Sequence, residues 1–193
     1  EQRLALQAFF YLLLTISTAE KIVFVPFSII LRTALAVSAG LGSSASFAVC
    51  IAACFLHYAK LQKNQMCDEQ LDQHELEKIS EYALRCEKIM HGQPSGVDNS
   101  VCTYGSFIRF RRGEPFENIS GVRKMKVLLV DTRVQRSTKA LVEKLADLKR
   151  RYPSIFDPVL DAIDSTAKEA LEVLKSSRNL PADGLTRSYE ELM

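Results

Sequence analysis

The sequence lacks the residue clusters that usually hold a zinc ion. Its three histidines, His57, His74 and His91, are isolated from one another along the chain, which excludes a histidine metal cluster. The cysteines are odd in number and include no CxxC pair: Cys50, Cys54, Cys67, Cys86 and Cys102. We therefore expect reduced thiols rather than disulfides or zinc ligands. Cys50 and Cys54 share one helical face, and we expect both to be small core residues.

A strong charge of either sign is also missing. The 25 basic and 23 acidic residues among 193 give a formal net charge of +2, which is too small to indicate a nucleic-acid or anionic-lipid partner. The first apolar stretch, residues 4–16, is too short to span a membrane, and Glu1 and Gln2 do not form a basic leader, so no signal peptide is indicated. The length suits one large domain or a domain and a half.

Charged residues are absent from Thr33 to Leu56. This run of about 24 residues is long enough to cross a bilayer, so a membrane span is one interpretation. Glycines and serines cluster in its middle, however, where a membrane span is normally most apolar. The alternative, which we favour, is a short apolar strand, a polar loop and a buried helix.

The loop in question is Ala39-Gly40-Leu41-Gly42-Ser43-Ser44-Ala45-Ser46. Glycines let a backbone approach an anion closely, and the first amides of the following helix point at that anion. No Lys-Ser or Lys-Thr follows the second glycine, so this is not the P-loop NTPase pattern, and the glycine spacing does not fit a dinucleotide site. A phosphate cradle and an ordinary glycine turn both remain open from these residues alone.

A second group of chemically useful side chains lies between Glu87 and Asp98. A helix is expected to end near His91, and the turn at residues 93–96 brings the chain back toward it. Two carboxylates on either side of such a turn can share one site, one holding Mg²⁺ and the other accepting a proton. The alternative is a solvated glutamate and a turn-forming aspartate, with Lys88 and His91 only balancing the helix dipole.

Hydrophobic spacing predicts a mixture of helices and strands without strict alternation, which favours the α+β class. Helices are expected at residues 3–17, 45–60, 74–90, 139–151 and 157–175, with a further helix beginning near 187. Strands are expected at residues 21–31, 106–110 and 126–131. An exposed connection is expected at residues 63–73.

Together, the two groups resemble the GHMP kinases, which phosphorylate small alcohols such as galactose, homoserine and mevalonate, and within them the mevalonate kinase branch. The loop AGLGSSAS is similar to the family's ATP-phosphate motif. The stretch EKIMHGQPSGVDNSVCTYG is similar to the segment that carries the Mg²⁺ glutamate and the catalytic aspartate. RLALQAFFYLLLTI and DTRVQRSTKALV extend the resemblance over nearly the whole chain, and the connection at residues 60–74 is least alike.

The resemblance implies a role for each matching residue. Asp98 would accept the proton of the mevalonate hydroxyl, and Ser44 and Glu87 would ligate Mg²⁺. Thr138 and Arg136 would lie near the substrate or the transferring phosphoryl group and bind it. ATP would be held by the loop and by one further serine: Gly40, Leu41, Gly42, Ser43, Ser44, Ala45 and Ser95. The implied product is 5-phosphomevalonate, an intermediate of isoprenoid and sterol synthesis, and the implied location is the cytoplasm, with peroxisomes as the alternative.

Two departures from the family pattern stand out. Ala36 occupies the position of a usual proline before the loop, and we expect altered nucleotide affinity rather than loss of function. The family's N-terminal lysine motif and C-terminal glycine-rich motif are not in this sequence, so we expect the middle of a longer protein. Another GHMP kinase, or a non-catalytic relative that only binds nucleotide, is the alternative reading of the same residues.

The implied fold is the two-domain GHMP kinase fold, incomplete at both ends. It has an N-terminal ATP-binding domain, expected at residues 1–133, and a ferredoxin-like C-terminal domain, expected to start within residues 134–193. The resemblance also implies a homodimer, and it implies neither a nucleic-acid nor a membrane partner.

Overall fold

The computed structural model describes residues 2–35, 40–65, 70–91, 94–105, 107–111, 113–122, 128–130 and 138–176. The chain divides into two compact units, Glu1–Pro115 and Phe116–Met193. This division does not test the domain boundary expected near residue 133, which stays a prediction.

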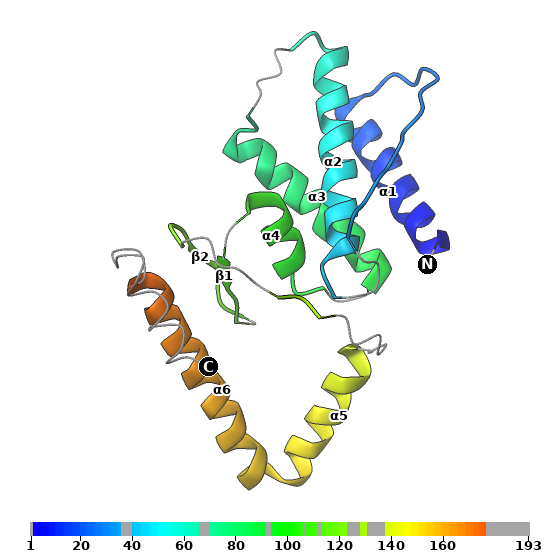
Figure 1. Ribbon diagram of the computed structural model, residues 1–193. Helices are drawn as coiled ribbons and strands as arrows, with labels where there is room; N and C mark the ends of the chain where they lie inside the picture. The colour runs from blue at the N-terminus through cyan, green and yellow to red at the C-terminus, as the bar shows by residue number, and fades with distance from the viewer. Residues whose placement is uncertain are drawn as a thin grey trace. The chain divides into compact units, whose positions relative to one another are not determined.

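The first unit is built from four helices around one apolar core. They are α1 (Gln2–Glu20), α2 (Ser43–Gln62), α3 (Gln73–His91) and α4 (Val97–Tyr104). Helix α2 is packed against each of the other three (Figure 1). The buried side chains of this core come from α1, α2 and α3: Ala8, Leu12, Ile16, Ala48, Val49, Ile51, Ala52, Phe55, Ile79, Ala83 and Cys86.

The three long helices confirm the sequence-based expectation, because their apolar residues recur at helical spacing.

Ion pairs link the helices at one end of the bundle. The Glu20 carboxylate lies 2.7 Å from the Lys63 Nζ and 3.4 Å from the Lys78 Nζ, so α1 is joined to the ends of both neighbours. The Lys63 hydrogen bond, more than any other contact, lowers the pKa of Glu20.

The strand predicted at residues 21–31 is wrong, because the described residues of this segment form neither strand nor helix. Its apolar side chains are largely exposed: Val23, Phe24, Val25, Phe27, Ile30 and Leu31. A β-strand needs a neighbouring strand to pair with its backbone N–H and C=O groups. Here the side chain of Gln62 pairs with the backbone of Val23 instead. The Gln62 amide accepts from the Val23 N–H at 2.9 Å and donates to the Val23 carbonyl at 2.7 Å.

Strands contribute little to the described residues. Strand β1 (Phe107–Arg109) confirms the strand predicted at 106–110, and β2 (Glu117–Ile119) was not predicted. The strand predicted at 126–131 is not formed over 128–130, where the three apolar side chains are exposed; the rest of that segment lies outside the described residues.

The second unit contains the helices α5 (Thr138–Arg151) and α6 (Pro153–Ser176), as the sequence predicts. Only Tyr152 separates them, and the Lys149 Nζ lies 3.4 Å from an Asp157 carboxylate oxygen across this turn. The helix expected near residue 187 lies outside the described residues.

Helix α2 is long and apolar enough to cross a membrane by length and composition, which is weak evidence because core helices pass the same test. It begins at Ser43, so the uncharged run is divided at the loop as expected.

The described cysteines are free thiols, and Cys86 is buried. Cys50 and Cys54 are exposed, which corrects their expected place in the core: their face of α2 is not the one that packs on α1 and α3.

Candidate phosphate and cation site

The glycine–serine loop enters α2 through two glycines with left-handed backbone. Gly40 has a φ of 74° and Gly42, the residue before the helix, has a φ of 69°. Side-chain-bearing residues rarely adopt this conformation. No side chain caps the first turn of α2 from the Gly42 position, so the positive end of the helix dipole faces the loop, which is the arrangement that suits phosphate.

Replacement of Gly42 by alanine should test this backbone requirement. An added Cβ would meet only the Cys102 Sγ, at 4.0 Å, which is an ordinary contact. The cost is therefore conformational, and we expect a loss of about 1–2 kcal/mol in the free energy of unfolding. Gly42→Asn is the matched control, because asparagine tolerates left-handed backbone. Equal loss in both variants, measured by urea unfolding, would contradict this explanation.

Glu87 is a buried carboxyl on the face of α3 that packs against its neighbours; its exposed fraction is 3%. Burial raises its pKa to about 7, and the negative charge of Asp98 adds to the rise. Among the side chains that the structure describes, no cation offsets this effect. A buried glutamate that is costly to ionise is well placed to bind a cation.

Asp98 belongs to the first turn of α4, a helix that the sequence analysis did not predict. Gly96 precedes this helix with a φ of 85°, and the Val97 N–H donates to the Ser95 Oγ at 3.3 Å. The β-branched and small polar residues of α4 favour helix weakly. Its packing on α2 and α3 supplies the missing stability, and it holds the exposed Asp98 carboxylate close enough to Glu87 for the charges to interact.

Cys102 joins the loop to the two carboxylates. Its Sγ lies beside Gly42, and it follows Asp98 by one turn on the same face of α4. Burial raises the pKa of the Cys102 thiol, and the charges of Asp98 and Glu87 raise it further. The glycine–serine loop and both carboxylates therefore lie around one thiol, which the sequence analysis did not single out.

Asn99, the neighbour of Asp98, is a second residue that sequence reasoning missed. Its exposed fraction is 1%. Its Nδ2 donates to the Ser80 Oγ at 2.9 Å and to the Ser80 carbonyl at 3.2 Å, so α4 is tied directly to α3.

Comparison with known proteins identifies the family of the chain. The profile of the GHMP kinases N terminal domain matches residues 5–106, more than half of the chain. The chain belongs to the GHMP kinase family. Its similar relatives include the mevalonate kinases of Homo sapiens, at 34% identity over all of this chain, and of Arabidopsis thaliana, at 34% over 88% of it. The mevalonate kinase of Dictyostelium discoideum is 37% identical over 76% of the chain.

This GHMP kinase chain spans about half the length of the curated relatives that it matches: 49% of the human protein, 45% of the Arabidopsis protein and 40% of the Dictyostelium protein. The matched profile begins within α1, runs through α4 and includes the loop, Glu87 and Asp98. The site therefore lies inside the part of the chain that defines the family.

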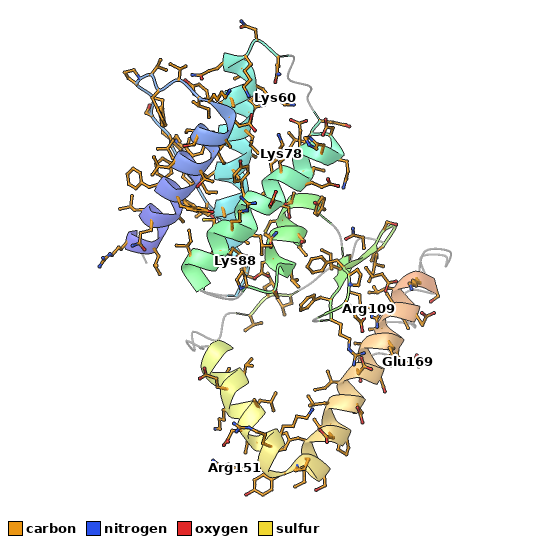
Figure 2. The ribbon with its side chains drawn as sticks, turned by 180° about the vertical axis from the view of Figure 1, so that it is seen from behind. Lys60, Lys78, Lys88, Arg109, Arg151 and Glu169 are labelled. Carbon is orange, nitrogen blue, oxygen red and sulfur yellow. The ribbon has the colours of Figure 1, made fainter. Side chains whose placement is uncertain are left out.

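Several residues expected at the site are described only in part. Ser44 is half-buried in the first turn of α2, and Ser95 is exposed just before α4. Arg136 and Ala36 lie outside the described residues. Thr138 begins α5, but its side chain is not described. Lys88 is exposed near the end of α3 (Figure 2).

The oxygen ligands available here suit a magnesium ion that is shared with a substrate better than a metal site made of protein ligands alone. No group of three or more metal-binding side chains occurs within the described residues. Magnesium is usually held by one or two carboxylates together with substrate phosphates. Glu87 could supply such a carboxylate, since it interacts electrostatically with Cys102, whose Sγ lies beside Gly42 of the glycine loop.

The raised pKa of Glu87 gives a prediction for the metal-free protein. The folded state binds the Glu87 proton more tightly than the unfolded state does, so stability is highest below about pH 4.5 as far as this group is concerned. The free energy of unfolding should fall as the pH rises toward about 7, by up to about 3 kcal/mol. Glu87→Gln should remove this slope in urea unfolding measured at several pH values. An identical slope in the variant would contradict the prediction.

Proposed function

We propose that the protein containing this chain is an ATP- and Mg²⁺-dependent kinase that phosphorylates mevalonate to 5-phosphomevalonate. One observation carries the proposal. The start of α2, which follows Gly42, lies near Cys102, and so do the buried Glu87 carboxyl and the exposed Asp98 carboxylate. The curated relatives named mevalonate kinase favour mevalonate over other small alcohols. The pathway served would be isoprenoid and sterol synthesis.

The proposed division of labour follows from burial. Amides from Gly40 to Ala45 would bind the ATP phosphates. Glu87, with Ser44, would hold Mg²⁺, which when bound neutralises charge on the phosphates. Ser95 would support the nucleotide from the turn before α4.

Asp98 would act on the acceptor. Its carboxylate is exposed and can therefore reach a substrate hydroxyl, accept its proton and leave the oxygen able to attack the γ-phosphorus. The developing negative charge would be met by the first amides of α2. Arg136 and Thr138 would contact the substrate or the transferred phosphoryl group.

Substrate-dependent ADP release by the full-length protein tests the proposal. Mevalonate, galactose and homoserine should be compared at equal concentrations with saturating Mg-ATP. We expect release with mevalonate at least about tenfold faster than with the other two, since a site built around one alcohol rejects analogues that leave polar groups unpaired. Faster release with galactose or homoserine would instead support another GHMP kinase, and no release with any alcohol would support a binding-only relative.

Homodimerisation and a cytoplasmic or peroxisomal location belong to the same proposal. Light scattering of the full-length protein during size-exclusion chromatography would test the dimer.

A further inference from the structure

A buried polar contact with no role in the proposed site joins α4 to α3 through Asn99 and Ser80. Both bonds come from the Asn99 Nδ2, at 2.9 Å to the Ser80 Oγ and 3.2 Å to the Ser80 carbonyl. Asn99 is among the largest fully buried side chains of the described residues. It therefore fixes α4 at one level of α3.

Asn99 is a polar side chain in a fully buried position. The Asn99 Oδ1 is buried and has no hydrogen-bond partner among the described residues. Leaving such an acceptor unpaired costs about 1–3 kcal/mol. Leucine has a similar size and no polar atoms, so the two bonds to Ser80 are what an asparagine adds at this place. Buried polar contacts of this kind can select one arrangement of packed helices over others.

The arrangement that Asn99 selects is the one that sets the candidate site. Ser80 and Glu87 are seven residues apart and so lie on the same face of α3. Asn99 directly follows Asp98 in α4. A rotation or slide of α4 on α3 would move Asp98 relative to both Glu87 and the loop. Catalytic groups lose effect steeply with misplacement, by about 100-fold for a shift of about 1 Å.

We propose that Asn99, through its two bonds to Ser80, is a positioning residue that sets α4 on α3 and thereby places Asp98 beside Glu87. The catalytic consequence rests on the proposed kinase function, whereas the helix placement does not. Asn99 itself touches no substrate in this scheme.

A matched pair of variants at Ser80 isolates the contact in the full-length protein. Ser80→Thr keeps the hydroxyl, and Ser80→Val has the same shape without it. We expect kcat of the valine variant to be about 3–10-fold below that of the threonine variant, with the KM for ATP changed less than about twofold. Equal kcat values in the two variants would overturn the proposal.

Asn99→Leu provides the second readout. We expect kcat to fall about 30–100-fold while the thermal midpoint stays within a few degrees of the parent's, since the lost bonds are offset by removal of the unpaired oxygen. A purely structural asparagine would give the opposite result: a lower midpoint and an unchanged kcat for the folded protein.

Hydrogen exchange over residues 97–104 separates this proposal from the proposed function. If the parent does not phosphorylate mevalonate, the function fails, but exchange still tests the positioning. We expect about tenfold faster exchange over α4 in Ser80→Val than in the parent, with Ser80→Thr unchanged, since one lost contact of about 1.4 kcal/mol corresponds to a factor of ten. Equal exchange in the parent, Ser80→Val and Ser80→Thr would overturn the positioning role.

Discussion

Asp98→Asn should lower the kcat for mevalonate phosphorylation about 1,000-fold. Asparagine has the same shape as aspartate but cannot accept the hydroxyl proton, and general bases contribute about 10²–10⁴-fold. Nucleotide affinity should change little, because in the proposed site the phosphates would be bound by the loop and by the first amides of α2. The measurements are ADP release for kcat and fluorescence titration with a labelled nucleotide for affinity.

Asp161→Asn is the matched control for Asp98→Asn. It makes the same change of charge on an exposed residue of α6, and its kcat should stay within about twofold of the parent's, as for most surface changes. If Asp98→Asn retained parental turnover, the assignment of Asp98 as the base would be wrong. A parallel loss of nucleotide binding would instead mean that the variant had disturbed α4.

Glu87→Gln should reduce kcat/KM at a fixed Mg²⁺ concentration by at least about 100-fold, the upper end of the effects seen for outer-shell partners of metal ligands. Glutamine retains the volume of the side chain but loses the charge that would attract the cation. Part of the activity should return when Mg²⁺ is raised well above the parental requirement, since the substrate phosphates also bind the ion. Activity as a function of Mg²⁺ concentration measures both effects.

The same substitution should have opposite effects on activity and on stability. At pH 7 and above, the metal-free variant no longer has to bury a charged carboxylate, so its unfolding free energy should exceed the parent's. Glu81→Gln, an exposed change on the same helix that breaks only the 2.6 Å contact with Arg85, should alter both quantities slightly. A Glu87→Gln protein that was both inactive and less stable would indicate misfolding instead of a lost metal ligand.

Sequence alone was sufficient for the long helices and for the two chemical groups. The apolar spacing of α1, α2 and α3 is strong enough to identify them, and the expected glycine loop does precede α2. The structure adds that Gly40 and Gly42 have left-handed backbone. The strand predicted at 21–31 is not formed, and the one predicted at 126–131 is not formed over its described residues, 128–130. A strand depends on partners distant in sequence, and in the described residues Gln62 supplies only a single pair of bonds, to Val23.

The features of the site that the sequence did not predict are contacts between helices. Helix α4 has weak local propensity, so its existence depends on packing that no sequence window contains. The proximity of Cys102 to Gly42 and of Asn99 to Ser80 likewise follows from how α4 lies on α2 and α3. The spacing of Glu87 and Asp98 suggested a shared site, but only the fold shows that one carboxyl is buried and the other exposed.

The burial of Cys86 makes this chain able to report its own opening. The thiol is wholly inaccessible, donates to the Ala8 carbonyl at 3.8 Å, and has its pKa raised to about 11 by burial. Three other described thiols are exposed, so an alkylating reagent will consume those first and reach Cys86 only when α1 separates from α3. Cys86 directly precedes Glu87. Its labelling rate, measured by mass spectrometry, therefore reports how often the helices around the site separate.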